Sequence, residues 1–157
     1  FAMIGLFGIF TQGVLIGPLT RKFGTRRLIP LSITLTGIGL VLIPYTQASM
    51  AWAQMVVVVS FIAIGNGVFQ PSSSTYLTRL ARNENYDLGG VMGAQESLGA
   101  FARILGPLSG GLVWELTVNK AFPWDYHTAF HLCGFIMLIS GLLTLRLPTL
   151  LEFDEAE

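Results

Sequence analysis

The chain has 157 residues, of which 52% are hydrophobic and 11% are charged, and its nine basic and nine acidic residues give a formal net charge of zero. Soluble globular domains carry about a quarter charged residues, so this composition excludes an ordinary soluble domain and favours a polytopic membrane protein. One cysteine, Cys133, excludes a disulfide framework and a cysteine-based metal site. No phosphate-binding loop, dinucleotide fingerprint or hydrolase motif occurs. We therefore expect no enzyme activity, cofactor, bound metal or nucleic-acid partner.

Five apolar stretches follow one another, each near or above the roughly 20 residues that a bilayer-crossing helix needs. They cover residues 1–20, 28–46, 50–77, 89–114 and 127–147. The predicted fold class is all-α, a transmembrane helix bundle over residues 1–147 followed by an acidic cytoplasmic tail at 148–157. Because the chain opens inside an apolar run without an initiator methionine, we expect a fragment that lacks upstream helices.

The first stretch combines small residues with one strongly polar side chain. Its glycines occur at spacings that predict close helix packing, namely Gly5, Gly8, Gly13 and Gly17. Gln12 lies at mid-depth, where it either contacts a transported solute or forms a hydrogen bond to another helix. Either role makes Gln12 a candidate site residue.

Basic residues are concentrated in alternate connections. The first connection holds Arg21, Lys22, Arg26 and Arg27, the third holds Arg79 and Arg82, and Arg146 lies at the C-terminal end of the last stretch. The opposite connections hold Lys120 alone. By the positive-inside rule, the 20–27 loop and the C-terminus are predicted to be cytoplasmic. The expected location is a plasma or inner membrane.

The second and fifth stretches have no charged residue in their middles, so they are predicted to be outer, lipid-facing helices. The third stretch differs, because Asn66, Gln70 and Ser73 share one face beside Pro71. A proline inside a span leaves a carbonyl free, which membrane helices tolerate best beside protein or a wet cavity. This pattern predicts a cavity-lining face with Asn66 and Gln70 as candidate substrate contacts.

The fourth stretch carries Glu96 and Arg103 among apolar residues. A charge inside the bilayer costs at least a few kcal/mol, so such residues normally face protein or water. At helical spacing, positions from 89 to 110 give one face of glycine, alanine, proline and these two charges, opposite a face of large apolar residues. We expect the small face to pack against protein. Glu96 is a candidate proton carrier, with a gating or structural ion pair as the favoured alternative, and Arg103 is a candidate cavity or inter-half contact.

His127 and His131 are four residues apart at the start of the last stretch, with Asp125 nearby. That spacing suits two metal ligands on one helix face, but two ligands are too few for a metal centre. Solvated histidines at the membrane interface are the favoured interpretation.

Two motifs resemble those of a known family. The run GPLTRKFGTRR resembles the loop signature of the major facilitator superfamily, matched by Gly17, Lys22, Gly24, Arg26 and Arg27, with Arg21 at its acidic position. The run from Ala102 is similar to the family's antiporter signature GxxxGPxxGG, with Ala102 in place of the first glycine and matches at Gly106, Pro107, Gly110 and Gly111. The alternatives are an ordinary basic cytoplasmic loop and an ordinary packing bend.

The order of elements is similar to helices eight to eleven of tetracycline-resistance-like drug:proton antiporters. On this resemblance the five spans correspond to helices eight to twelve of a twelve-helix fold, with the equivalent part of the N-terminal half as the second choice. The resemblance implies two halves that alternate access to a central site. The expected function is secondary active export of amphipathic organic solutes in exchange for protons. The expected partners are the lipid bilayer, a small organic solute, protons and the N-terminal half. The alternatives are a transporter-like receptor or scaffold without transport activity, and a uniporter of small organic solutes.

Overall fold

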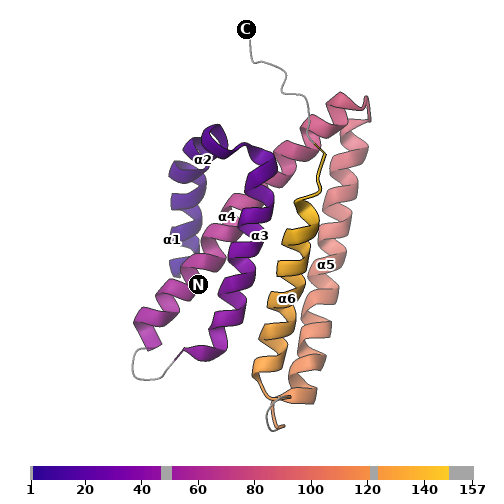
Figure 1. Cartoon of the computed structure of the whole chain (residues 1–157). Helices are drawn as coiled ribbons and strands as arrows, with labels where there is room; N and C mark the ends of the chain where they lie inside the picture. The colour runs from indigo at the N-terminus through magenta and orange to yellow at the C-terminus, as the bar shows by residue number, and fades with distance from the viewer. Residues whose placement is uncertain (1, 47–50, 121–123, 149–157) are drawn as a thin grey trace.

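The computed structural model describes residues 2–46, 51–120 and 124–148, and all regular structure in these ranges is helical (Figure 1). In chain order the elements are α1 (Ala2–Phe10), the π-helical turn η1 (Thr11–Leu15), α2 (Ile16–Phe23), α3 (Thr25–Leu42), the 3-10 turn η2 (Ile43–Tyr45), α4 (Ala51–Asn83), α5 (Leu88–Thr117) and α6 (His127–Thr144). The predicted all-α class is confirmed. The predicted acidic tail lies outside the described residues apart from Pro148.

Three helices of the described chain are long and apolar enough by themselves to cross a membrane. They are Thr25–Tyr45, Trp52–Asn83 and His127–Thr144, with mean hydropathies of 1.9, 1.8 and 1.5. The first predicted span is divided by η1, and the fourth carries Glu96, Arg103 and Pro107 among its apolar residues. Membrane crossing by these two elements remains a prediction.

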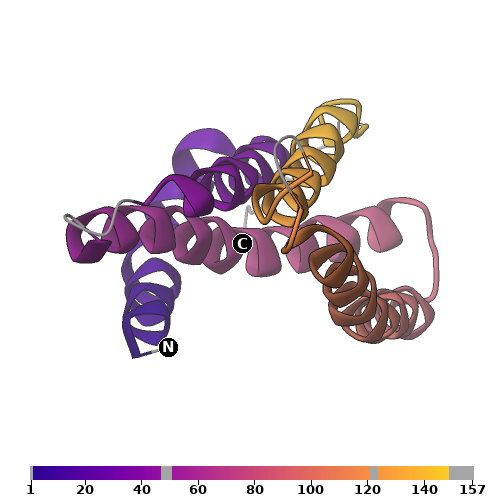
Figure 2. The ribbon, with the colours of Figure 1, turned by 90° about the horizontal axis from the view of Figure 1, so that it is seen from below.

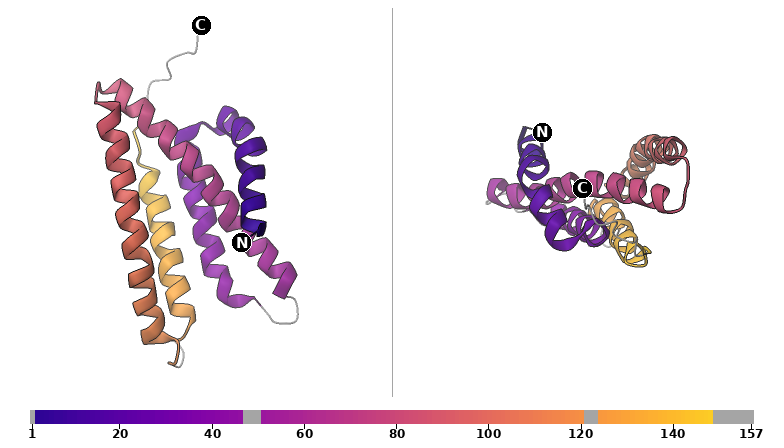
Figure 3. Two further views of the ribbon diagram at one scale, coloured as in Figure 1. Left: turned by 180° about the vertical axis from the view of Figure 1, so that it is seen from behind. Right: turned by 90° about the horizontal axis from the view of Figure 1, so that it is seen from above.

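Helix α4 is the oblique spine of the bundle. Seen from below and from above, α3 and α6 lie on one side of α4, whereas α1 and α5 project from its other side near opposite ends (Figures 2 and 3). The chain therefore has a packed side, on which α3 lies against both α4 and α6, and an open side, on which α1 and α5 stand apart.

Small residues bring α3 and α4 into close contact. A Cβ atom added to Gly39 would lie 2.7 Å from Cγ1 of Ile62, and one added to Gly65 would lie 2.7 Å from the carbonyl oxygen of Ser32. Such contacts leave no room for a side chain, so glycine sets the helix separation. Helix α3 packs against α4 and α6 and contributes much of the buried core, while Leu31 and Ile38 on its other face are exposed. Helix α6 is largely exposed. That these two helices face lipid stays a prediction.

A hydrophobic cluster joins α3 to α4 near the end where the 20–27 loop lies. Ile29, Ile33 and Tyr76 are buried there, and Leu147 packs against them. The hydroxyl of Tyr76 donates a hydrogen bond to the carbonyl oxygen of Pro148 at 3.0 Å. Nε of Arg26 donates to the carbonyl oxygen of Leu147 at 2.8 Å. The segment after α6 is thereby fixed to the start of α3 and to α4.

Helix α5 begins with a side-chain cap and then stands largely free. Oδ2 of Asp87 accepts a hydrogen bond of 2.7 Å from the backbone N–H of Gly90, which satisfies one of the unpaired N–H groups of the first turn. Most side chains between Leu88 and Leu116 are exposed. Contacts with α4 and α6 hold the helix in place without covering it.

Candidate functional site

The five polar residues singled out by the sequence lie in three elements, which are η1 and α5 on the open side and the central helix α4. Gln12 lies in η1, Asn66 and Gln70 in α4, and Glu96 and Arg103 in α5. All five side chains are exposed within this chain. No hydrogen bond or ion pair among the described residues joins any two of them.

Gln12 lies in a π-helical turn that packs on α4. The backbone N–H of Ile16 donates to the carbonyl oxygen of Thr11, five residues earlier. The hydrogen-bonded loop therefore contains one residue more than in an α-helix. The Thr11 hydroxyl donates to the carbonyl oxygen of Phe7 at 2.6 Å, and Thr11 is fully buried. A Cβ atom on Gly67 would lie 3.1 Å from Thr11, so the turn fits against α4 at that point. Sequence reasoning missed the turn, since no residue pattern marks it.

Contacts between helices place three of the five residues at a similar depth. The Thr11–Gly67 contact sets Gln12 level with Asn66. On the α4–α5 hairpin, Nε2 of Gln95 lies 3.5 Å from Oγ of Ser74 as a weak donor. From that contact Asn66 and Arg103 are each eight residues, about 12 Å, farther along their own helices, which diverge because α4 runs obliquely (Figure 1). Counted along the helices, Gln12, Asn66 and Arg103 therefore lie at comparable distances from the α4–α5 turn, and they are called the polar layer below.

Gln70 and Glu96 lie closer to the turn that joins α4 and α5, beside the contact between Ser74 and Gln95. Sequence reasoning missed Gln95 and Ser74, although a glutamine adjacent to Glu96 and the serine after Ser73 were visible signals. These two residues connect α5 to the spine within a polar region.

Arg103 extends back along its own helix. A Cβ atom on Gly99, one turn earlier, would lie 3.8 Å from Nη2 of Arg103. Glu96 lies about 10 Å along the axis from Arg103, and the two side chains form no ion pair in the described part of the chain. The structural ion pair considered for Glu96 is therefore not made by these residues. Both charges are available to a solute or to other protein.

The glycines on the small-residue face of α5 have no close neighbour on another helix among residues 2–46, 51–120 and 124–148. A Cβ atom placed on Gly93 or on the signature glycines would meet no atom within 4 Å, and these signature positions are Gly106, Gly110 and Gly111. The same holds for Gly5, Gly8, Gly13 and Gly17. The close packing predicted for these glycines is absent among the described residues. The bulky face of α5 is exposed as well, at Leu98, Phe101 and Leu105.

The loop signature forms the joint between the open and the packed side. Gly24 separates α2 from α3 with φ of 72° and ψ of 152°, a conformation that is essentially restricted to glycine. Gly17, Gly24 and Arg21 line a cleft of about 460 Å³ together with Arg79 of α4. Arg21, which stands at the acidic position of the family signature, thus adds positive charge at the cleft.

The remaining cations of the loop point in different directions. The ammonium group of Lys22 lies 5.5 Å from the centre of the Phe23 ring. Arg26 binds the Leu147 carbonyl, whereas Arg27 is exposed on the first turns of α3. The signature therefore combines a glycine turn, a link to the end of the chain and exposed charge.

Aromatic and imidazole rings gather at the opposite end of α3 and α6. His131 stacks on Tyr45 with 5.6 Å between ring centres, and Nδ1 of His127 lies 2.8 Å from Oδ2 of Asp125. Burial of the Asp125 carboxyl raises its pKa, but the hydrogen bonds and charge of His127 outweigh this effect, so the pKa of Asp125 lies below its usual value. The described ranges contain no group of three or more ligand-type side chains that suits a metal ion.

The family match and the similar proteins agree with one another. Residues 1–155 match the Major Facilitator Superfamily. Over 135 residues the chain is 31% identical to Multidrug resistance protein 1 of Bacillus subtilis (strain 168). This match covers 86% of the present chain and 33% of the relative. Over 140 residues it is 26% identical to Multidrug resistance protein 2 of the same organism, covering 89% of this chain and 32% of the relative. No solved structure matches the chain.

The chain spans about a third of the length of these curated relatives. The family match covers nearly every residue, and it agrees with the loop signature, the GPxxGG run and the all-helical fold. The chain belongs to the major facilitator superfamily.

Proposed function

We propose that this chain forms the last five membrane helices of a secondary active transporter that exports amphipathic organic solutes in exchange for protons by alternating access. The 20–27 loop and the C-terminal segment lie on the cytoplasmic side of a plasma or inner membrane. The remaining helices of the protein, including the N-terminal half, cover the exposed sides of α1 and α5.

One observation carries the proposal. In a chain that belongs to a transporter family, the polar layer of Gln12, Asn66 and Arg103 interrupts otherwise apolar helices, and each of the three side chains is exposed. Exposed polar groups in such helices need water, a solute or other protein, because hydrocarbon cannot satisfy them. A path between the two halves supplies all three.

The cargo class is supported by the relatives and by the residues. Both relatives are named multidrug resistance proteins. Polar side chains among apolar ones, such as Gln70 beside Phe69, suit an amphipathic organic solute, since pockets for such molecules combine apolar walls with few polar groups.

The test measures solute movement in everted membrane vesicles that contain the whole protein. Gradient-driven accumulation of a panel of amphipathic fluorescent dyes is compared for the wild type, Arg103→Ala and Arg82→Ala. Arg82 is an exposed cation on α4 outside the polar layer, so it controls for loss of charge alone. We expect at least a tenfold lower initial rate for Arg103→Ala and a rate within twofold of wild type for Arg82→Ala, at equal amounts in the membrane.

Equal rates for the two variants would remove Arg103 from the mechanism. Absence of wild-type transport across the panel would favour the receptor or scaffold. Transport that persists after the proton gradient is dissipated would favour the uniporter.

Glu96 is the coupling candidate of this proposal, and Glu96→Gln separates its roles. A proton carrier loses gradient-driven accumulation while it keeps exchange of labelled for unlabelled solute, because exchange needs no net proton movement. A gating or structural role lowers both activities together. We expect accumulation to fall at least tenfold and exchange to remain within twofold of wild type.

A further inference from the structure

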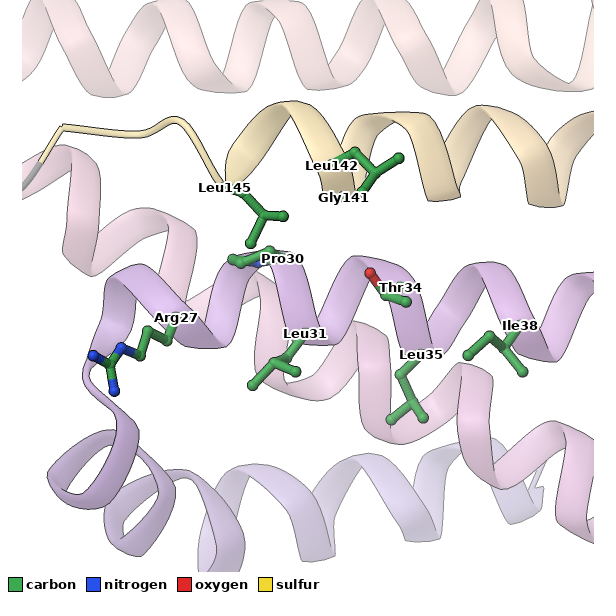
Figure 4. A pocket seen from close by; sticks show the side chains of 9 residues that line it. All are labelled: Arg27, Pro30, Leu31, Thr34, Leu35, Ile38, Gly141, Leu142 and Leu145. Carbon is green, nitrogen blue, oxygen red and sulfur yellow. The ribbon is translucent and has the colours of Figure 1, made fainter.

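An apolar groove runs along α3 and α6 on the face that is turned away from α4 (Figure 4). Its volume is about 550 Å³. Its walls are formed mainly by Arg27, Leu31, Leu35 and Ile38 of α3 and by Leu142 and Leu145 of α6 or its end. The groove lies apart from the polar layer, since the α3 residues that face α4, such as Ser32 and Thr36, are buried on the other side.

Positive charge is confined to one end of this groove. Arg27 lies at that end, and Ile38 lies at the other end of the row of α3 side chains. Arg146 is exposed and directly follows Leu145. The groove has no acidic residue in its lining. A molecule with an anionic head and an apolar body matches this distribution.

The length of the groove matches one leaflet of a bilayer. Arg27 and Ile38 are eleven residues apart on a helix, about 16 Å along its axis. The hydrocarbon core of a bilayer is about 30 Å thick, so one leaflet contributes about 15 Å. A head group held at Arg27 therefore places an acyl chain along Leu31, Leu35 and Ile38 to the middle of the membrane.

Close helix contacts define the groove before a ligand arrives. A Cβ atom on Gly141 would lie 2.7 Å from Oγ1 of Thr34, and one on Gly37 would lie 3.1 Å from Cβ of Met137. The hydrogen bond from Arg26 to the Leu147 carbonyl fixes the end of α6 beside the start of α3. A wall that is already formed reduces the ordering that binding requires.

We propose that this groove binds one anionic phospholipid, with its phosphate on Arg27 and one acyl chain along α3 and α6. Basic residues at the cytoplasmic end of membrane helices attract anionic head groups, and the cytoplasmic placement of Arg27 rests on the proposed function. The site is separate from the solute path, so a transport defect alone neither supports nor opposes it.

The test measures lipid selectivity of the whole protein purified in a mild detergent. Phosphatidylglycerol and phosphatidylcholine with identical acyl chains are added in equal amounts, and native mass spectrometry counts the lipids that remain bound. Arg27→Gln removes the charge at the groove, whereas Arg82→Gln removes an exposed charge outside it. Gly141→Leu fills the groove wall and retains both arginines.

We expect the wild type and Arg82→Gln to retain phosphatidylglycerol at least fivefold over phosphatidylcholine. Arg27→Gln should lower this preference to below twofold, and Gly141→Leu should reduce total lipid retained while the charge is unchanged. Equal retention of the two lipids by the wild type, or equal selectivity of Arg27→Gln and Arg82→Gln, would overturn the proposal. Because Gly141→Leu can disturb the helix contact, Leu142→Ala serves as a second groove variant, for which we expect weaker retention of phosphatidylglycerol in a protein with the wild-type elution profile.

Discussion

The two sides of α4 use the same kind of residue with opposite results. On the α3 and α6 side, atoms of a neighbouring helix occupy the space beside the glycines. An added Cβ would collide with another helix at Gly39, Gly65 and Gly134. On the α1 and α5 side, Gly8 and Gly110 meet nothing within 4 Å. Small residues in membrane helices therefore mark where backbones approach, and within the described chain most of these approaches are on the α3 and α6 side, with the Thr11–Gly67 contact as an exception on the α1 side.

Polar groups follow the same division. On the packed side, Ser32 and Thr36 are buried and donate their hydroxyl hydrogens to carbonyl oxygens of their own helix. On the open side, Gln12 and Arg103 are exposed and make no such local bond in the described chain. Hydroxyls that satisfy themselves can be packed away, whereas amides and guanidinium groups need an external partner.

The largest effect should come from filling a glycine of the packed side. In Gly65→Ala the new Cβ lies 2.7 Å from the Ser32 carbonyl oxygen and 3.0 Å from the Thr36 nitrogen, both backbone atoms that cannot turn aside. We expect the free energy of unfolding to fall by about 3 kcal/mol, at the upper end for overpacked sites. Thermal unfolding of the purified protein, followed by size-exclusion chromatography, measures the loss.

Gly110→Ala is the matched change on the open side, because it adds the same methyl group to a helix that offers free space in this chain. If other helices of the protein pack on this face, Gly110→Ala slows dye transport while the α3–α4 contact stays intact. If Gly65→Ala and Gly110→Ala lost equal stability and transported dye at the same rate, the proposed difference between the packed and the open side would be contradicted.

The joint between the two sides depends on backbone conformation rather than on space. Gly24 has φ of 72°, yet a Cβ there would meet no atom within 4 Å. Gly24→Ala should therefore cost about 2 kcal/mol through backbone strain alone. Thermal unfolding measures this change, and Gly17→Ala, which is helical and equally open, is the control. A melting temperature of Gly24→Ala equal to that of Gly17→Ala would contradict the strain argument.

Hydropathy alone predicted the order of the helices, and most of their ends were right to within a few residues. The largest difference is α4, predicted to end at residue 77 and observed to continue to Asn83. The apolar run ends at residue 77, but Leu80 and Ala81 still pack and the arginines are good helix formers, so the helix continues. The π-helical turn at Thr11 was beyond prediction, because it depends on how Thr11 fits Gly67 of another helix.

The candidate site stays a prediction. Gln12, Asn66 and Arg103 were identified from polarity inside apolar runs, and they lie in η1, α4 and α5. The sequence carries no information on their relative positions, which depend on two contacts between helices at Gly67 and Ser74.

A smaller loss of stability is expected when the hydrogen bond between Tyr76 and the segment after α6 is removed. Tyr76 is 3% exposed, and its hydroxyl donates to the Pro148 carbonyl oxygen at 3.0 Å. Tyr76→Phe keeps the ring and removes this bond, so we expect a loss of about 1 kcal/mol. Tyr86→Phe is the control, because Tyr86 is 63% exposed on the α4–α5 connection. A melting temperature of Tyr76→Phe equal to that of Tyr86→Phe would show that the link does not stabilise the fold.

The smallest effect should come from the end of the packed side that lies opposite the 20–27 loop, and it should depend on pH. The pKa of Asp125 is lowered in the folded protein, where the interaction with His127 outweighs desolvation, so the ionised carboxylate stabilises the fold. Its contribution is fully present above the ordinary carboxyl pKa of 3.8 and is lost as the pH falls through the lowered folded value. Asp125→Asn should therefore lower the melting temperature at pH 7 by less than Gly24→Ala does, and the difference from wild type should shrink below about pH 4. Glu84→Gln, an exposed carboxyl at the opposite end of the bundle, is the control, and a difference that stays constant from pH 7 to pH 3 would show that the His127 partnership adds no stability.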